Sequence, residues 1–138
     1  MPYLIDTDVL IYHLANVQEA NQLLVDLAPE GIAISIITYM EVYQGISRNL
    51  DQETAQEQFQ FFLEGVPVLP FSLSVARRCA LLRERLKQEG KRVRARALDV
   101  MNATIAIENN LILVTHNGKD YEDIPDLHLY ENTAFSKE

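Results

Sequence analysis

The sequence has little cysteine and no long hydrophobic run. Cys79 is the only cysteine in 138 residues, which excludes an internal disulfide and a cysteine-rich zinc module. The longest apolar runs, such as residues 111–114 and 32–34, are far shorter than the roughly 20 residues of a membrane-spanning helix. The first residues also lack the basic and apolar segments of an export signal. We therefore expect a cytoplasmic protein without a transmembrane segment.

Motifs of several enzyme classes are missing as well. The chain has no glycine-rich phosphate loop and no Gly-x-Ser-x-Gly elbow. Its three histidines, His13, His116 and His128, show no metal-ligand spacing. With 48% hydrophobic and 23% charged residues, the chain has globular proportions, and we expect one domain over residues 1–138.

The charge is divided unevenly along the chain. The net charge is −8, which by itself disfavours a nucleic-acid partner. Residues 77–96, the basic segment, nevertheless hold nine of the 12 Lys and Arg residues and only two acids, so this segment carries +7 and the remainder −15. Such a separation allows one side of the protein to bind a polyanion. The alternative is a solvated helix that keeps its basic residues in water.

Apolar patterns predict alternating strands and helices. Short apolar runs predict strands over residues 3–5, 32–36, 66–69 and 111–114, with a weaker one over 127–130. Helical spacing predicts helices over residues 9–15, 19–28, 38–45, 52–63, 72–89 and 96–109. Because parallel strands need crossover helices, this alternation predicts an α/β fold with a parallel sheet. Functional groups in such folds gather beyond the carboxyl ends of the strands.

Carboxylates follow several of the predicted strands. Convergent acids repel each other unless a cation neutralises them, and an all-oxygen site prefers Mg²⁺ or Mn²⁺. Each acid also has a structural explanation: Asp8 as a helix N-cap, Glu41 in a capping box with Thr38, and Asp99 as a complement to a helix dipole. Asp6 is harder to explain without a partner because it directly follows a buried strand. The candidates are Asp6, Asp8, Glu41, Asp99, Asn117 and Asp120.

Four blocks of the sequence together resemble PIN-domain ribonucleases, and most closely the VapC-type toxins of toxin-antitoxin modules. The blocks are residues 3–11 with Asp6, residues 35–45 with Glu41, Asp99, and residues 113–121 with Asn117. The resemblance spans nearly the entire chain in order and spacing. It implies a three-layer α/β/α PIN-like domain with a four- to five-stranded parallel sheet.

The resemblance also implies an activity and partners. A PIN-domain toxin is a Mg²⁺- or Mn²⁺-dependent endoribonuclease that hydrolyses RNA, such as tRNA or ribosomal RNA, forms a homodimer, and is blocked by an antitoxin protein. By position, Asp6, Glu41 and Asp99 match the metal-binding acidic triad, and Asn117 matches a fourth catalytic position. The sequence departs from the family at Asn102, where an apolar residue is usual, and at Tyr121, where Phe is common.

Within the basic segment, the residues just before Asp99 are our candidates for RNA phosphate contacts: Arg92, Arg94 and Arg96.

Two other functions remain open from the sequence. Residues 4–10 also resemble the first motif of haloacid-dehalogenase-type phosphatases, with Asp6 as a covalent nucleophile and Asp8 as an acid-base. Only 23 residues follow Thr115, however, which leaves little room for the later motifs of that family. The second of these functions is that of a catalytically weak PIN-like module that binds RNA or protein. It would bind through the basic segment and through Phe61, which lies outside the apolar stripe of its helix.

Overall fold

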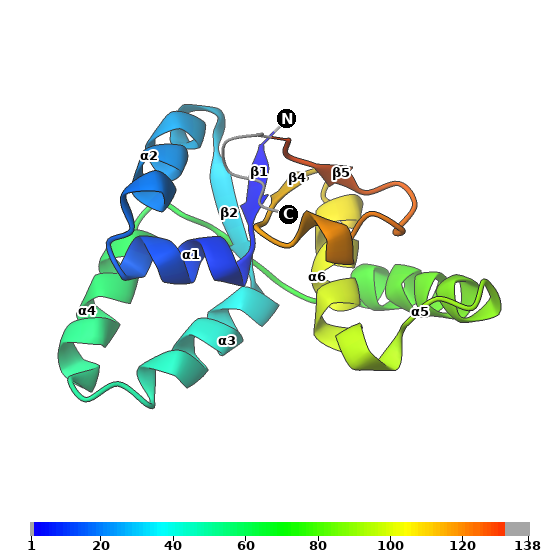
Figure 1. Ribbon diagram of the computed structural model, residues 1–138, viewed down its shortest axis with the longest axis horizontal. Coiled ribbons are helices and arrows are strands. Elements are labelled where there is room, and N and C mark those ends of the chain that lie inside the picture. The colour runs from blue at the N-terminus through cyan, green and yellow to red at the C-terminus, as the bar shows by residue number, and fades with distance from the viewer. Residues whose placement is uncertain (1, 132–138) are drawn as a thin grey trace.

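A five-stranded parallel sheet forms the centre of the protein in the computed structural model, which describes residues 2–131 (Figure 1). The strand order is β3-β2-β1-β4-β5 and every neighbouring pair is parallel. The predicted α/β class with a parallel sheet is confirmed, including the weak fifth strand. The strands are β1 (Tyr3–Ile5), β2 (Ile32–Ser35), β3 (Val68–Leu69), β4 (Ile112–Val114) and β5 (His128–Leu129).

Helices cover both faces of this sheet. Figure 1 shows α1, α2 and α4 on one side and α5 and α6 on the other. Each helix lies within two residues of its predicted bounds at both ends. None of the helices in residues 2–131 is long and apolar enough to cross a membrane. The helices are α1 (Thr7–Leu14), α2 (Gln18–Leu27), α3 (Ile36–Ile46), α4 (Gln52–Leu63), α5 (Leu73–Gln88) and α6 (Ala97–Glu108).

Alternation along the strands divides the core into two halves. Successive side chains of a strand point to opposite faces, so Leu4 packs in the core beneath α5 and α6 whereas Ile5 packs in the core beneath α1, α2 and α4. Both side chains are completely buried. The sheet therefore has a separate core on each face, which is the predicted three-layer α/β/α arrangement.

The predicted apolar stripes of two helices are confirmed. In α5 the buried side chains are Val75, Cys79, Leu82 and Leu86. In α4, Phe59 is completely buried whereas Phe61 is 75% exposed, as expected from its position off the stripe. The helical spacing of apolar residues therefore predicted correctly which faces of α4 and α5 are buried.

The helices α1 and α3 each begin two residues earlier than predicted, and this corrects two of the capping interpretations. Asp6, not Asp8, is the N-cap of α1. Ser35 is the N-cap of α3 and accepts a hydrogen bond from the backbone N of Thr38, so Thr38 is already inside the helix. Glu41 consequently lies in the second turn of α3, where it cannot form a capping box with Thr38. The capping-box interpretation of Glu41 is therefore wrong.

Candidate active site

The pairing of β1 with β4 brings two polar residues together at the carboxyl edge of the sheet. Ile5 pairs with Val114, and the backbone N of Asp6 donates to the carbonyl of Val114 at 2.9 Å. The next residue after β4, Thr115, then donates from its hydroxyl to Asp6 Oδ2 at 2.7 Å. Parallel strands end at the same edge, so the sheet itself creates this contact between residues 109 positions apart.

Asp6 is a buried carboxylate surrounded by donors. It is 8% exposed. Its Oδ1 accepts from the backbone N of Thr7 at 2.9 Å and from Asn102 Nδ2 at 3.1 Å. Its Oδ2 accepts from Thr115 and from the Tyr121 hydroxyl at 3.2 Å. A buried carboxylate is tolerated where its oxygens are satisfied in this way.

Despite these donors, Asp6 holds its proton more tightly than an ordinary aspartate. The pKa of Asp6 is raised from 3.8 to about 7. Burial is the largest cause, the charges of Asp8 and Asp99 act in the same direction, and the hydrogen bonds from Thr115 and Thr7 oppose them. A carboxylate whose charge is unfavourable in the folded chain is a group that a bound cation would stabilise.

Asp99 lies beside Asp6 and shares one donor with it. Asp99 is in the first turn of α6, as predicted, and its Oδ1 is 3.2 Å from the Tyr121 hydroxyl that also contacts Asp6. Burial raises the pKa of Asp99 and raises that of Tyr121 far above its ordinary value. Tyr121 therefore stays protonated, and its single proton serves one of the two carboxylates at a time.

Asn102 and Tyr121 are the site residues that sequence reasoning undervalued. Both stand where the sequence departs from the resembled family, and both contact Asp6. Asn102 is 3% exposed, and its Oδ1 has no hydrogen-bond partner within residues 2–131. A buried polar side chain in an otherwise apolar helix was the available signal, because a polar group at such a position needs a partner.

Glu41 is tied to the site through α1. Its Oε1 accepts from the Thr7 hydroxyl at 2.5 Å, and the same hydroxyl lies 3.0 Å from Thr38 Oγ1. Thr7 directly follows Asp6, so this hydrogen bond fixes the α3 carboxylate next to the start of α1. Thr7 and Thr38 were not among the predicted site residues.

Asp8 joins the site, whereas Asp120 turns toward the basic segment. Asp8 Oδ2 accepts from the backbone N of His116 and from Asn117 Nδ2, both at 3.1 Å. Burial raises the pKa of Asp8, and the charge of His116 opposes this shift. Asn117 thus reaches Asp8 rather than Asp6 or Asp99. Asp120 instead lies 3.6 Å from Arg92.

The donor chemistry of this cluster fits Mg²⁺ or Mn²⁺ bound by few side chains. Within residues 2–131, no three His, Cys, Asp or Glu side chains lie close enough to hold a metal ion by themselves. Mg²⁺ usually keeps several waters and takes one or two protein carboxylates. Asp6 and Asp99 both contact Tyr121 and provide such a pair, and Asn102 Oδ1, which has no partner among residues 2–131, adds a buried oxygen. The fit is therefore to a partly hydrated ion rather than to a closed cage.

The three predicted RNA-binding arginines do not share one environment. Arg92 and Arg94 are exposed. Arg96 is 5% exposed, and its two terminal nitrogens each donate to an oxygen of Asp123 at 2.7 Å. Arg96 therefore forms a structural ion pair with Asp123 and leaves no free donor face for a phosphate. The prediction that Arg96 binds RNA is wrong. Arg96 is buried by its contacts with Asp120 and Asp123. These contacts cannot be recognised from a run of basic residues in the sequence.

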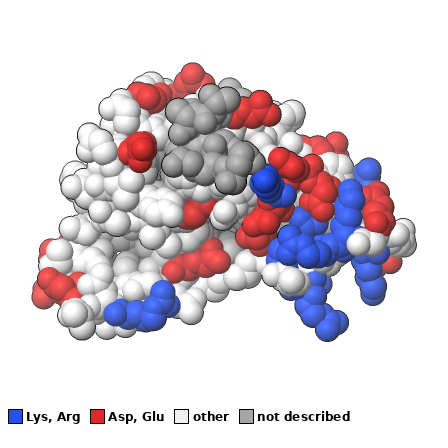
Figure 2. Space-filling model, in the orientation of Figure 1, with Lys and Arg blue, Asp and Glu red and all other residues white. Residues whose placement is uncertain are grey.

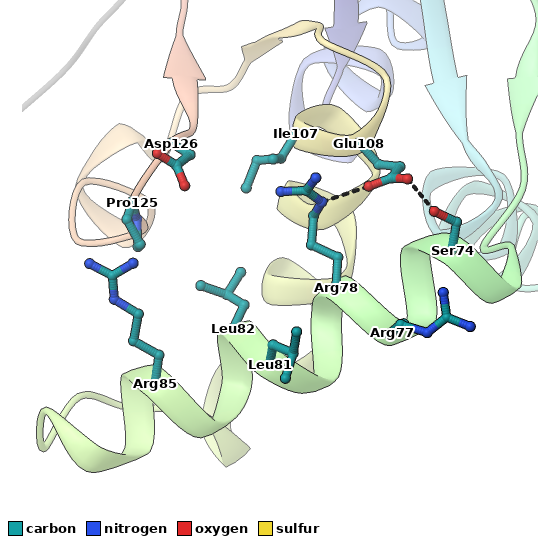
Figure 3. Close-up of a pocket in the computed structure, with 10 residues that line it drawn as sticks. All are labelled: Ser74, Arg77, Arg78, Leu81, Leu82, Arg85, Ile107, Glu108, Pro125 and Asp126. Atoms are coloured by element: carbon teal, nitrogen blue, oxygen red, sulfur yellow. Dashed lines mark hydrogen bonds and ion pairs between the residues drawn. The ribbon is translucent and has the colours of Figure 1, made fainter.

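Most of the basic side chains gather on the α5 and α6 side of the protein (Figure 2). Part of this surface forms a hollow of about 430 Å³ between α5, the end of α6 and residues 125–126 (Figure 3). Arg78 spans it to bond Glu108 at 2.6 Å, and Ser74 contacts the same carboxylate. Glu108 and Asp99 are nine residues apart on α6, or about 13 Å along the axis. The hollow is therefore separate from the acid cluster.

Comparison with known proteins identifies the family. The PIN domain profile matches residues 3–127. Ribonuclease VapC2 of Rickettsia felis is 30% identical over 129 residues, covering 92% of this chain and 95% of the relative. The tRNA(fMet)-specific endonuclease VapC of Salmonella typhimurium is 26% identical and covers 94% of this chain and 96% of its own.

Solved structures agree with this match. The crystal structure of VapBC2 from Rickettsia felis bound to a promoter DNA fragment superposes with a TM-score of 0.85 at 30% identity, covering 94% of this chain and 98% of that one. VapBC-1 from nontypeable Haemophilus influenzae gives a TM-score of 0.82 at 26% identity, covering 95% and 98%. These matches exclude the phosphatase alternative. The profile match and the fold agree, and the chain belongs to the PIN-domain family.

Proposed function

We propose that this chain is a metal-dependent endoribonuclease and the toxin of a type II toxin-antitoxin system. The observation that carries the proposal is the buried Asp6, which shares the Tyr121 hydroxyl with Asp99 at the carboxyl edge of a PIN-domain sheet. Relatives that match more than 90% of the chain are named ribonucleases and endonucleases. RNA is the substrate we assign, in the cytoplasm, where both tRNA and ribosomal RNA are found.

Each site residue has a distinct part in this mechanism. Asp6 and Asp99 would hold Mg²⁺ or Mn²⁺, and Glu41, oriented by Thr7, would act on the ion through one of its bound waters. When bound, such an ion neutralises phosphate charge and lowers the pKa of water to supply the nucleophile. Tyr121 lies between Asp6 and Asp99 and donates its proton to one of them at a time. Asn117 donates to Asp8 and is exposed, and it would position the attacking water or the substrate phosphate.

Arg92 and Arg94 are the phosphate-binding residues in this proposal. Both are exposed and lie in the basic segment directly before Asp99. Arg96 supports them indirectly, because its Nε donates to the carbonyl of Arg92 at 2.7 Å while its guanidinium binds Asp123. An ion pair buried at this point fixes the backbone that presents Arg92 and Arg94 to RNA.

An antitoxin is the partner protein that we assign. Structures similar to this chain are described as VapBC and toxin-antitoxin complexes. A groove of about 840 Å³ runs between α1, α2 and α4, and Val25 and Phe61 are 65% and 75% exposed beside it. We expect Phe61→Asp to weaken antitoxin binding and retain RNA cleavage, and Leu73→Asp, which alters an exposed leucine of α5, to change neither. Binding of the antitoxin to the Phe61 variant at parental affinity contradicts the assignment.

A homodimer is part of the proposal as well. Ile36 and Met40 of α3 are 40% and 46% exposed and lie four residues apart, so they share one face of the helix. Met40→Asp should convert the dimer to a monomer in sedimentation experiments. If the parental chain sediments as a monomer, this part of the proposal fails without affecting the nuclease assignment.

RNA cleavage tests the main proposal directly. The purified chain, free of antitoxin, is incubated with bulk tRNA and ribosomal RNA in Mg²⁺ or Mn²⁺. We expect discrete fragments that disappear with EDTA and with Asp99→Asn, but persist with Asp26→Asn, because Asp26 is an exposed acid of α2 outside the site. Cleavage by Asp99→Asn at the parental rate refutes the site. Intact RNA under all conditions, with retained RNA binding, favours the catalytically weak binding module.

A further inference from the structure

An aromatic pair borders the acid cluster and has no part in the mechanism above. Tyr12 of α1 is 45% exposed, and its ring meets that of His116 edge to face, with centroids 4.8 Å apart and planes at 87°. His116 follows Thr115, whose hydroxyl donates to Asp6. The exposed ring is thus separated from the buried carboxylate by two consecutive residues of the loop after β4.

Hydrogen bonds hold this pair in a fixed position. The backbone N of His116 donates to Asp8 at 3.1 Å, so the loop is anchored to the first turn of α1. Asp8 and Tyr12 are four residues apart on the same helix and therefore lie on one face, about one turn from each other. The same helix face thus carries a site carboxylate and, about 6 Å further along, an exposed ring. A nucleotide bound at the carboxylates would place a neighbouring base within reach of that ring.

The chemistry of an exposed, supported ring suits an unpaired base. Proteins that recognise single-stranded RNA stack splayed bases on aromatic side chains, and a ring already fixed by its neighbours loses little entropy on binding. Tyr39 and Tyr43 differ from Tyr12 because they pack against the buried Phe59, where their rings serve the core.

We propose that Tyr12, supported by His116, stacks an unpaired RNA base adjacent to the scissile phosphate and so selects the cleavage position. This inference rests on the proposed nuclease function and adds a specificity-determining residue to it. Tyr12 acts by binding the substrate and has no part in the chemical step. Its removal therefore affects where and how tightly RNA binds more than the rate at saturation.

Base stacking can be measured without cleavage. The binding protein is the Asp99→Asn variant in Mg²⁺, and the probes are short single-stranded RNAs in which 2-aminopurine replaces one base at a time. We expect fluorescence quenching at one position. Adding Tyr12→Ala should abolish the quenching and weaken binding by about 5- to 150-fold, the range for one base–aromatic stack. Tyr12→Phe, which keeps the ring, should preserve both.

Ile11→Ala is the matched control, because Ile11 is 47% exposed on the same helix but about 100° away around its axis. It should leave quenching and affinity unchanged. Equal quenching and affinity in Tyr12→Ala and its parent overturn the inference, as does the absence of quenching at every probe position.

Failure of the inference is distinguishable from failure of the nuclease assignment. Cleavage of bulk RNA is assayed with the protein that retains Asp99. Active protein in which Tyr12→Ala changes neither KM nor the cleavage position refutes the stacking role alone. Tyr12-dependent quenching by a chain that never cleaves RNA refutes the nuclease alone.

Discussion

Asp6→Asn should stabilise the metal-free protein at neutral and alkaline pH while it abolishes cleavage. The folded chain raises the pKa of Asp6 from its ordinary 3.8 to about 7. Between these two values the folded state retains a proton that the unfolded chain releases, so the stability present below pH 4 is lost as pH rises toward 7. The neutral amide of Asn removes this dependence.

The size of the effect follows from the shift. A difference of about 3 pKa units corresponds to about 4 kcal/mol at 1.36 kcal/mol per unit, which is the upper bound on what the ionised Asp6 costs above pH 7.

The hydrogen bonds of the site allow most of this gain to be realised. In an Asn side chain the oxygen would face the two obligate N–H donors, Thr7 and Asn102, that now contact Oδ1. The amide nitrogen would face the hydroxyls of Thr115 and Tyr121, which rotate to accept.

Urea unfolding followed by circular dichroism from pH 4 to pH 8 in EDTA measures this difference. The parental chain should lose stability relative to Asp6→Asn as pH rises, whereas Asp26→Asn should run parallel to the parent. Mg²⁺ should stabilise the parental chain at pH 8 and have little effect on Asp6→Asn, because binding to the folded state alone raises stability. Parallel pH curves for the parent and Asp6→Asn, or a less stable Asp6→Asn at pH 8, refute the reasoning.

Three further outcomes follow from the contacts of the site and the basic segment. Arg96→Ala should cost about 2 kcal/mol in urea unfolding, because it removes the partner of the partly exposed Asp123 and the donors to the carbonyls of Arg92 and Asp120. The exposed Arg77→Ala should cost less than about 0.5 kcal/mol, and similar losses for the two variants would contradict a structural role for Arg96. Arg92→Ala and Arg94→Ala should each lower RNA affinity and reduce the slope of log affinity against log salt concentration by about one charge. Arg77→Ala is the comparison. An unchanged slope would show that Arg92 and Arg94 do not contact RNA phosphates. Tyr121→Phe should stay folded and lose about 1 kcal/mol of unfolding free energy, the value of one hydrogen bond. It should also change the Mg²⁺ concentration at half-maximal cleavage. An unchanged metal dependence would show that the Tyr121 hydroxyl does not position Asp6 and Asp99.

Local pattern predicted the elements and the acids well. Short apolar runs marked all five strands, and the rule that parallel strands end at one edge placed Asp6 near the loop after β4, where Thr115 now contacts it. Helix boundaries were less accurate at their starts. Asp6 directly follows β1, which ends at Ile5 as predicted, and Ser35 ends β2 one residue before the predicted end. Both helices begin immediately after these polar residues, whose side chains satisfy the first free N–H groups.

Contacts between distant parts of the chain decided the rest of the site. Asn102 donates to Asp6 across 96 residues, and Arg96 reaches Asp123 across 27, although each looks ordinary in its own helix or charged run. The packing of α6 against the sheet decides which carboxylate binds a basic residue and which lies near other acids. The pKa shifts of these groups follow from this packing, because they depend on burial and on the distance between charges.

The sequence by itself determined the parallel α/β fold, the acids available to the site and the uneven distribution of charge, because hydrophobic period and residue chemistry are local properties. Only the tertiary structure decided that Tyr121 joins Asp6 to Asp99, that Asn117 turns to Asp8 and that Tyr12 stands beside His116. These relations arise when separate elements are packed together, and no periodicity along the chain records the distances between them.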